Sequence, residues 1–176
     1  DGVGNRTKVI DPNDHETGFT YDILNRLKTL TDALNHTTTF VLDGNGNTLT
    51  VTDANAGVLT NTYDGLNRLL TTRDQLNHIT TFTYDENGNA LTMKDALNHT
   101  TTNTYDAVNR LATTQDALLN TTTFGYDAVG NRTSVLDANL HTMAFGYDLL
   151  NRLISQTNAL NETTSFGYDA VGNRTS

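Results

Sequence analysis

The five histidines are the residues whose type and spacing could bind a metal ion. They are His15, His36, His78, His99 and His141, and all occupy one position of a repeated pattern. If each repeat contributes two β-strands, equivalent side chains of consecutive repeats lie about 9–10 Å apart. A shared zinc ion requires each nitrogen at about 2.0–2.1 Å from the metal. The spacing therefore predicts histidines that cap turns or face solvent, and no metal site.

Two acidic stretches match the beginning of a calcium-binding loop. They are Asp43-Gly-Asn-Gly-Asn47 and Asp85-Glu-Asn-Gly-Asn89. An EF-hand loop needs glycine at its sixth position and glutamate at its twelfth. Here Thr48 or Ala90 stands at the sixth position, and alanine stands at the twelfth. We interpret both stretches as hairpin turns, and weak calcium binding by clustered turn carboxylates stays an open alternative.

The remaining polar residues form no arrangement typical of catalysis. Aspartates can act as paired acids and bases, but near-identical repeats would then need a near-identical active site in every repeat. Serine is rare, and no Ser/His/Asp set stands apart from the repeats. No glycine-rich loop precedes a helix pattern, so a phosphate-binding loop has no support. We predict a non-enzymatic protein without a cofactor.

These polar residues belong to a repeat that fills the chain. One series of aspartates recurs every 21 residues, and a second series with the same period is offset by ten. The first series comprises Asp1, Asp22, Asp43, Asp64, Asp85, Asp106, Asp127, Asp148 and Asp169. The second comprises Asp11, Asp32, Asp53, Asp74, Asp95, Asp116 and Asp137, with Asn158 in the eighth place. No linker interrupts the pattern, so we predict a single repeat array over 1–176, a fragment of a longer repeat protein.

Each first-series aspartate opens a turn that glycine or asparagine closes three residues later. Gly4, Gly46, Gly88, Gly130 and Gly172 alternate with Asn25, Asn67, Asn109 and Asn151. These two residue types most readily adopt positive φ, and a type I turn followed by a left-handed residue closes a short hairpin. We call the two kinds glycine turns and asparagine turns. A pair of them, 42 residues long, is the larger repeat.

Four turns of the second series lack such a closing residue. Its place is taken by Asp14, Ala56, Leu119 and Leu140. In two of these turns Gly57 or Asn120 follows one residue later. We expect these two loops to be longer by one residue.

The segments between the turns are rich in Thr, Leu, Val, Phe and Tyr, which is typical of β-strands. Consecutive strands joined by tight turns are antiparallel. Every tyrosine directly precedes a first-series aspartate: Tyr21, Tyr63, Tyr84, Tyr105, Tyr126, Tyr147 and Tyr168. Phenylalanines stand two residues earlier, so both columns share a face of the strand: Phe19, Phe40, Phe82, Phe124, Phe145 and Phe166. We predict an all-β meander of about 16 or 17 strands without helix.

A flat sheet with this many strands would expose a long apolar face, and sheets normally twist and curl. We expect a continuous spiralling sheet, shell or tube with the aromatic residues inward. Aliphatic side chains of the intervening strands should complete a continuous apolar ribbon; candidates are Leu27, Leu69, Leu111, Leu153, Val9, Val51, Met93 and Val135. The recurring arginines should pair with turn carboxylates of adjacent repeats or lie in solvent. They are Arg26, Arg68, Arg110 and Arg152, with Arg6, Arg132 and Arg174 one residue later in the other repeats.

Composition excludes several classes of partner. The formal net charge is −9, and an acidic surface repels phosphate backbones, so we expect no nucleic-acid partner. The chain has no cysteine, which excludes a disulfide scaffold and thiolate metal sites. No apolar run reaches 18 residues, so we expect no membrane span in this segment.

The phrase Tyr-Asp-x-x-Gly/Asn, followed by Arg and a strand, resembles the YD repeat of Rhs proteins. Good examples are Tyr63-Asp-Gly-Leu-Asn-Arg-Leu69 and Tyr126-Asp-Ala-Val-Gly-Asn-Arg132, and one repeat substitutes Leu42-Asp43. The resemblance covers essentially the whole chain. It implies a spiralling sheet of strand-turn-strand units that closes into a hollow shell. Such shells occur in Rhs polymorphic toxins, cocoon components of insecticidal toxin complexes, wall-associated proteins and teneurins.

In the toxins of this family, the shell encloses a C-terminal effector that is released by self-cleavage at a motif containing Asp-Pro-x-Gly. The single proline here lies in Ile10-Asp-Pro-Asn13, which lacks that glycine. The resemblance therefore carries neither cleavage nor cargo to any residue of this chain.

Three functions compete for a repeat array of this kind. The first is a structural module of a secreted or cell-surface bacterial assembly, such as a fibre, tube or wall-associated protein. The second is part of a toxin shell that encapsulates an effector. The third is a carbohydrate-binding or adhesive surface. The expected partners are neighbouring repeats or further copies of the chain, and an encapsulated effector in the second case.

Overall fold

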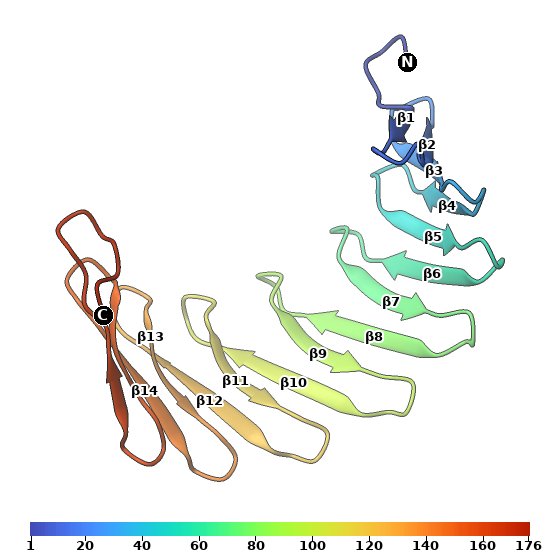
Figure 1. Cartoon of the computed structure of the whole chain (residues 1–176). Helices are drawn as coiled ribbons and strands as arrows, with labels where there is room; N and C mark the ends of the chain where they lie inside the picture. The colour runs from blue at the N-terminus through green and yellow to red at the C-terminus, as the bar shows by residue number, and fades with distance from the viewer. The chain divides into compact units, whose positions relative to one another are not determined.

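The computed structural model describes every residue from Asp1 to Ser176. It contains 16 β-strands and no helix. Hydrogen-bonded neighbours follow the order of the sequence from β1 to β16, as the colours of Figure 1 illustrate. The predicted all-β class, with antiparallel strand-turn-strand repeats and no helix, is confirmed.

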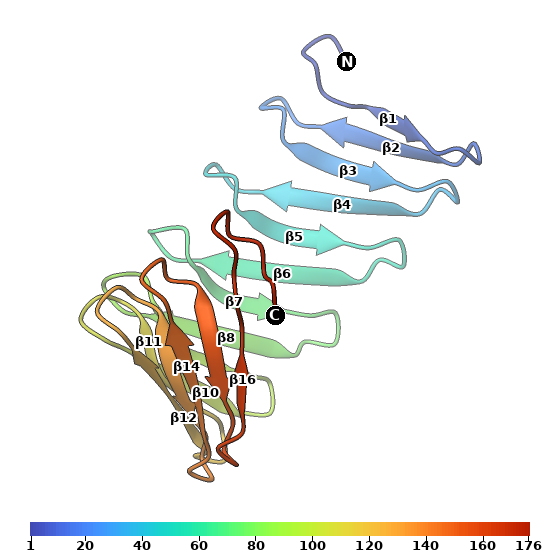
Figure 2. The same ribbon diagram turned by 60° about the vertical axis from the view of Figure 1, so that its left-hand side comes forward.

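The strands belong to two compact units, of which the first comprises Asp1–Thr83 and Lys94–Asn98. Its strands are β1 (Lys8–Ile10), β2 (Glu16–Tyr21), β3 (Leu27–Thr31), β4 (Thr37–Leu42), β5 (Thr48–Thr52), β6 (Val58–Tyr63), β7 (Leu69–Arg73) and all but the last residue of β8 (Ile79–Tyr84). Figure 2 shows β1 to β6 as adjacent arrows of alternating direction with a turn at each end.

The second unit comprises Tyr84–Met93 and His99–Ser176. Its strands are β9 (Ala90–Lys94) without its last residue, β10 (Thr100–Tyr105), β11 (Leu111–Gln115), β12 (Thr121–Tyr126), β13 (Arg132–Leu136), β14 (Thr142–Tyr147), β15 (Leu153–Thr157) and β16 (Thr163–Ser165). A final turn follows β16, and an isolated antiparallel bridge between Tyr168 and Arg174 closes it.

Each first-series hairpin is closed by a tight turn and a β-bulge. In the β2–β3 hairpin, the backbone N–H of Asn25 donates to the carbonyl of Asp22 at 3.0 Å, and the N–H of Asp22 donates to the carbonyl of Arg26 at 2.9 Å. The register then shifts between Thr20 and Tyr21, so that Tyr21 pairs with Leu27. The same shift recurs before Leu42, Tyr63, Tyr105, Tyr126 and Tyr147. The extra residue is Lys28, which lies between Leu27 and Thr29 and has no partner in β2. The second-series turn of Asn35 also ends in a left-handed residue but shows no such shift, so the bulge belongs to the strand that follows a first-series turn.

The two faces of the sheet differ in chemistry because directly paired residues share a face. On one face Phe124 pairs with Val135, and Val135 pairs with Met143. On the other face Thr113 pairs with both Thr104 and Thr123. The hydroxyl groups of Thr104 and Thr113 lie 2.7 Å apart and form a hydrogen bond.

The continuous apolar ribbon expected on the aromatic face is interrupted, so that expectation was wrong. Six of the eight predicted aliphatic residues do pair with an aromatic residue. Val51 pairs with Phe40 and Val135 with Phe124, and the tyrosines Tyr21, Tyr63, Tyr105 and Tyr147 pair with Leu27, Leu69, Leu111 and Leu153. Elsewhere Asn103 takes the place of a phenylalanine and pairs with Thr114. Its amide donates to the carbonyl of Ala90 at 3.1 Å. A side chain that bonds the neighbouring backbone thus replaces apolar contact at these positions.

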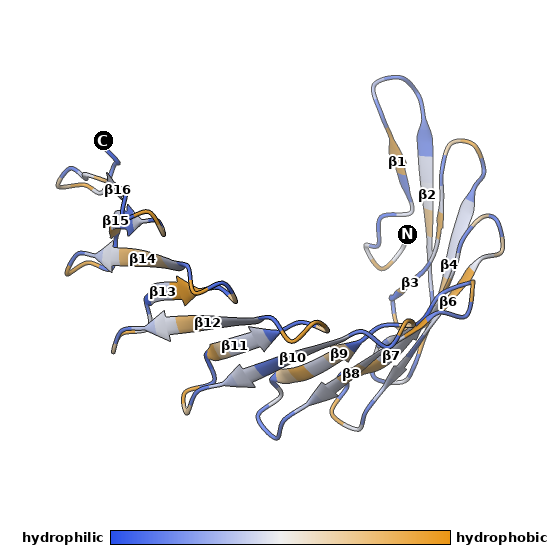
Figure 3. Ribbon diagram, turned by 90° about the horizontal axis from the view of Figure 1, so that it is seen from below, coloured by the Kyte–Doolittle hydropathy of each residue, from blue (hydrophilic) through white to orange (hydrophobic).

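No side chain of the chain is fully buried. All strands lie in one sheet, so no second layer of strands or helices shields the side chains on either face from solvent. Many apolar side chains of the turns are open to solvent, as with Leu150, which is 71% exposed. Figure 3 shows orange, hydrophobic segments at several turns as well as in strands such as β13. The cohesion of the sheet therefore comes from contacts between neighbouring strands and turns.

The two loops expected to be longer by one residue have the ordinary length, so that prediction was wrong. Ala56 and Leu119 themselves adopt the left-handed conformation, with φ of 62° and 67°. The N–H of Leu119 donates to the carbonyl of Asp116 at 3.0 Å, as in the regular turns. The hydrogen bonds that Asp116 makes hold this leucine in a conformation that costs about 1–2 kcal/mol for an ordinary residue.

Candidate functional site

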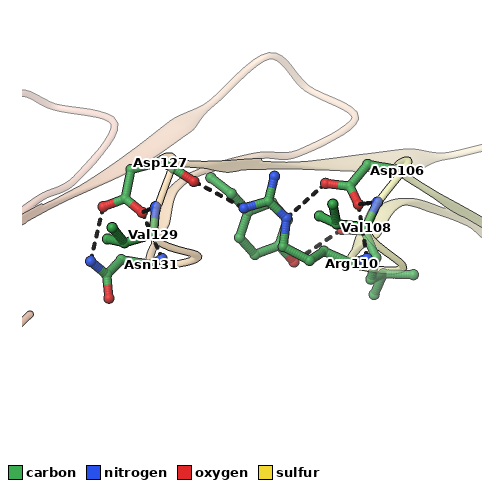
Figure 4. A network of polar contacts seen from close by, with 8 residues as sticks. Asp106, Val108, Arg110, Asp127, Val129 and Asn131 are labelled. Atoms are coloured by element: carbon green, nitrogen blue, oxygen red, sulfur yellow. Dashed lines mark hydrogen bonds and ion pairs between the residues drawn. The ribbon is translucent and has the colours of Figure 1, made fainter.

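The best-defined polar cluster of the chain surrounds the aspartate that opens each first-series turn. In the turn of Asp106, one carboxylate oxygen accepts the backbone N–H groups of Val108 at 3.0 Å and Arg110 at 2.9 Å. The other oxygen accepts Nε of Arg110 at 2.7 Å. The carboxylate therefore closes the turn from inside, and Figure 4 shows this arrangement.

The pKa of Asp106 is lowered chiefly by the hydrogen bond from the backbone N–H of Arg110, with a further contribution from the Arg110 side chain. In the glycine turn of Asp127, the amide of Asn131 is the largest cause of the lowered pKa. Hydrogen bonds to a carboxylate favour its charged form. Both carboxylates are therefore suited to permanent acceptance of hydrogen bonds rather than to proton transfer near neutral pH.

The residues that close the first-series turns all have positive φ, as their types predict. The values are 60° to 63° for Asn25, Asn67, Asn109 and Asn151 and 90° to 99° for Gly4, Gly46, Gly88, Gly130 and Gly172. The glycines lie further from the left-handed region that other residues tolerate. The two kinds of turn therefore differ in backbone conformation as well as in side chain.

Arginine links an asparagine turn to the glycine turn that follows it. One terminal nitrogen of Arg110 donates to the carbonyl of Asp127 at 2.9 Å, and its guanidinium carbon lies 4.6 Å from the ring centroid of Tyr126. Arg152 makes the same pair of contacts with Asp169 and Tyr168, at 3.3 and 4.7 Å. Figure 4 shows Arg110 between the Asp106 carboxylate and the Asp127 carbonyl. The carboxylate partner of each arginine is in its own turn, which corrects the expected pairing with an adjacent repeat.

Asparagine links a glycine turn to the asparagine turn that follows it. The amide nitrogen of Asn131 donates to its own Asp127 and to the side-chain oxygen of Asn151, both at 2.9 Å. The amides of Asn5, Asn47 and Asn89 make the equivalent bonds to the next asparagine turn. We call the junction between two consecutive first-series turns a seam. Two kinds of seam therefore alternate along the array.

Tyrosine closes both kinds of seam. The hydroxyl of Tyr126 donates to the carbonyl of Leu111 at 3.0 Å, and that of Tyr147 donates to the carbonyl of Arg132 at 3.1 Å. The same bond, from a hydroxyl to a carbonyl 15 residues earlier, is made by Tyr21, Tyr63, Tyr105 and Tyr168. Each ties the end of one strand to the strand that follows the previous first-series turn.

Four histidines lie at second-series turns and bond the aspartates that open them. Nδ1 of His36 lies 2.9 Å from a carboxylate oxygen of Asp32. His15, His78 and His141 make the equivalent contact. They are turn caps, in agreement with the sequence.

The structure distributes the predicted repeat-defining residues along the array rather than gathering them into one pocket. The sequence singled out the arginines but predicted the wrong carboxylate partner for them, and the linking role of the asparagines was missed. The sequence does carry a signal for the seams, because the residue after the closing position alternates between Arg and Asn, as in Arg110 and Asn131.

No helix of the chain is long and apolar enough to span a bilayer.

Several solved structures have a similar fold, and one of them is a Tc holotoxin. The chain superposes on the crystal structure of TcdB2-TccC3 with a TM-score of 0.73 and 19% identity, covering 91% of this chain and 11% of that one. For TcdB2-TccC3-Cdc42 the TM-score is 0.72 and the identity 17%, with the same coverage. For the Photorhabdus luminescens Tc holotoxin pore they are 0.73 and 16%, covering 88% of this chain and 10% of that one. The chain thus spans about a tenth of these structures and shares their fold.

Sequence comparison defines the family. No curated protein matches the chain. The sequence profile of the Teneurin YD-shell family matches residues 4–176. Because this match covers nearly every residue, the chain belongs to the Teneurin YD-shell family.

Proposed function

We propose that this chain is a non-enzymatic segment of the wall of a YD shell, within a secreted or cell-surface bacterial assembly. The observation that carries the proposal is the use of the distinctive side chains. Arg110, Asn131 and Tyr126 all bond the neighbouring turn or strand. A wall needs this kind of contact, in which each repeat holds the next.

Family membership and the fold support the shell reading. Within it, two uses remain distinct. A toxin shell would enclose an effector polypeptide, whereas a tube, fibre or wall-associated protein would present its surface to other molecules. The regular alternation of the two seams favours an extended wall, because each pair of repeats can be followed by an identical pair.

Localisation provides the first test. An antibody against the chain should label intact cells of the source organism or detect the protein in the culture medium. Protease treatment of intact cells should remove the surface signal, while a cytosolic marker stays protected. Confinement of the protein to the cytosol of unlysed cells would contradict the secreted or cell-surface reading.

Electron microscopy of the isolated assembly tests the wall itself. We expect a continuous layer of antiparallel strands in which this segment occupies part of the layer. An enclosed polypeptide, together with an Asp-Pro-x-Gly cleavage motif in the same assembly, would identify the toxin shell. If this chain lay outside any continuous layer of strands, the proposed structural role would be contradicted.

A further inference from the structure

One second-series turn departs from the pattern at the position that normally bonds its aspartate. In five other turns of this series, the side chain four residues after the aspartate bonds its second carboxylate oxygen, as His36 bonds Asp32. In the turn of Asp53 that position holds Gly57. One oxygen of Asp53 accepts the backbone N–H groups of Asn55 and Gly57, both at 2.8 Å, and the other oxygen has no partner in the chain.

A second departure lies beside the first, in the next turn of the same series. Gln75 stands directly after the opening aspartate, where the other second-series turns have alanine or proline. The two turns, between β5 and β6 and between β7 and β8, lie at the same end of the strands, as Figure 2 shows. A Cβ added at Gly57 would overlap Oε1 of Gln75 and lie 2.7 Å from Oδ2 of Asp53. Two acceptor oxygens from different turns therefore converge on the place that a histidine or asparagine side chain occupies elsewhere.

Asp53 and Gln75 line a hollow of about 370 Å³ whose other walls are mostly apolar. Val51, Leu59 and Leu76 form part of those walls. Such walls favour the burial of a hydrocarbon stem, because contact with them removes apolar surface from water. The hollow therefore offers apolar contact together with two hydrogen-bond acceptors, one of them charged.

The negative charge available in the hollow is that of Asp53. Asp74 also lines the hollow, but Nδ1 of His78 lies 2.9 Å from its carboxylate. Arg73, at the end of β7, forms no ion pair with Asp53. A ligand that complements the hollow therefore has to bring the positive charge itself.

We propose that this hollow binds an arginine side chain of a partner protein. A guanidinium group holds several N–H donors in one plane, so one can donate to the free oxygen of Asp53 and another to Oε1 of Gln75. An ammonium group is more strongly hydrated and matches two fixed acceptors less well. The methylene stem of the arginine lies against Leu59 and Leu76. The inference goes beyond the proposed structural function, because it gives the wall a partner bound at its turns.

The probe is Nα-acetylarginine amide, titrated into the intact chain labelled with nitrogen-15. The amide resonances of Gly57 and of the Gln75 side chain should shift to saturation, with a dissociation constant on the order of 1–10 mM, as expected for one partly exposed charge. Nα-acetylcitrulline amide, which has a similar shape without the charge, should bind at least about tenfold more weakly. Equal binding of the two probes, or no binding of either, would overturn the proposal.

Two substitutions at the turn itself should remove the site. Asp53→Asn should weaken binding of Nα-acetylarginine amide at least about tenfold and keep the turn, because the side-chain oxygen of Asn158 makes the same two backbone contacts. Gly57→His should abolish binding, because a histidine there can bond Asp53 as His36 bonds Asp32. Circular dichroism checks that both variants keep their β-structure, and unchanged binding by either folded variant would refute the assignment.

The contribution of the second acceptor is tested separately. Gln75→Ala should weaken binding several-fold and leave the free energy of unfolding unchanged; lower stability with unchanged binding would make Gln75 a structural partner of Asp53 and overturn the proposal. His36→Gly is the matched control, because it frees an oxygen of Asp32 where Ala54 stands in the place of Gln75. Equal binding at that new position would also overturn it. None of these outcomes depends on the location of the assembly or on its layer of strands, so the proposed function stands or falls separately.

Discussion

At the scale of the residue, the opening aspartate acts mainly as a hydrogen-bond acceptor for the backbone of its own turn. The one second-series turn that opens with asparagine makes the point. The side-chain oxygen of Asn158 accepts the N–H groups of Leu160 at 2.9 Å and Glu162 at 3.0 Å. A neutral oxygen thus reproduces the two backbone contacts. In the aspartate turns the second carboxylate oxygen accepts a further side chain, as from Arg110, His36 or Asn131.

The left-handed leucine offers a stabilising substitution. Leu119 is 74% exposed and has φ of 67°. Leu119→Asn should raise the free energy of unfolding by about 0.5–1 kcal/mol, because asparagine tolerates this conformation better than leucine does. Urea denaturation followed by circular dichroism measures the change. Leu118→Asn is the control, since Leu118 is exposed but lacks positive φ; an equal gain there would attribute the effect to removal of surface leucine instead.

The glycine that closes a glycine turn offers the opposite substitution. Gly130 has φ of 99°, and an added Cβ would meet no atom within 4 Å. Gly130→Ala should therefore lower the free energy of unfolding by about 1–2 kcal/mol through backbone strain alone. Gly44 also has open space around it but no positive φ. Gly44→Ala should cost nothing, and similar losses for both glycines would refute the explanation by strain.

At the scale of the element, the tyrosine before a first-series turn makes two contacts, one within its own hairpin and one with the preceding hairpin. Tyr126 follows the bulge and pairs with Arg132 across its own hairpin. Its hydroxyl reaches the carbonyl of Leu111 in the preceding hairpin. The extra residue of the bulge is Thr133, in the facing strand β13. The hydroxyl of Tyr126 therefore links its hairpin to the preceding one.

Removal of the Tyr126 hydroxyl measures how much its hydrogen bond across the seam contributes to the stability of the fold. Tyr126→Phe keeps the ring and removes the donor to Leu111, so it should lower the free energy of unfolding by about 0.5–1.5 kcal/mol. Thermal or urea denaturation reports the change. Thr123→Val removes a hydroxyl from the same strand that makes no side-chain hydrogen bond, and it should have little effect. A loss for Thr123→Val as large as that for Tyr126→Phe would contradict the role assigned to the tyrosine.

At the scale of the whole molecule, the turn aspartates link stability to pH. Their pKa values are lowered by hydrogen bonds in both turn series, as for Asp22 through the N–H of Arg26 and for Asp32 through the N–H of His36. A carboxylate with a depressed pKa in the folded state stabilises the fold above its unfolded pKa. That contribution is lost as the pH falls through the lower, folded value.

The free energy of unfolding should therefore fall gradually below about pH 4, because each turn aspartate contributes a small loss as it becomes protonated. Urea midpoints measured from pH 7 down to pH 2 should be nearly constant at first and then fall. Asp116→Asn, which keeps the acceptor and removes one titrating group, should have a slightly shallower acid slope than the parent chain. Stability that rises as the pH falls below 4 would contradict the role of these carboxylates.

Sequence patterns alone predicted the strands, the turns and the columns of aromatic residues. Asp, then two free residues, then Gly or Asn specifies a turn through local backbone preference, so the closing positions such as Asn109 and Gly130 could be read directly. The regular spacing also gave the antiparallel order, because short turns allow no other connection. The predicted loop length was wrong at Ala56 and Leu119, because the aspartate at the start of each turn imposes a left-handed conformation that alanine and leucine disfavour.

The contacts across the seams could be identified only from the tertiary structure. Whether Arg110 pairs with its own Asp106 or with another repeat depends on the bulge and the strand register, which place its guanidinium between two turns. The bond from Asn131 to Asn151 likewise joins residues 20 apart in the chain. The sequence by itself determined what each residue can do within its own turn, since those interactions span four residues or fewer. Only the tertiary structure decided which groups meet across the seams, because register and twist bring them together.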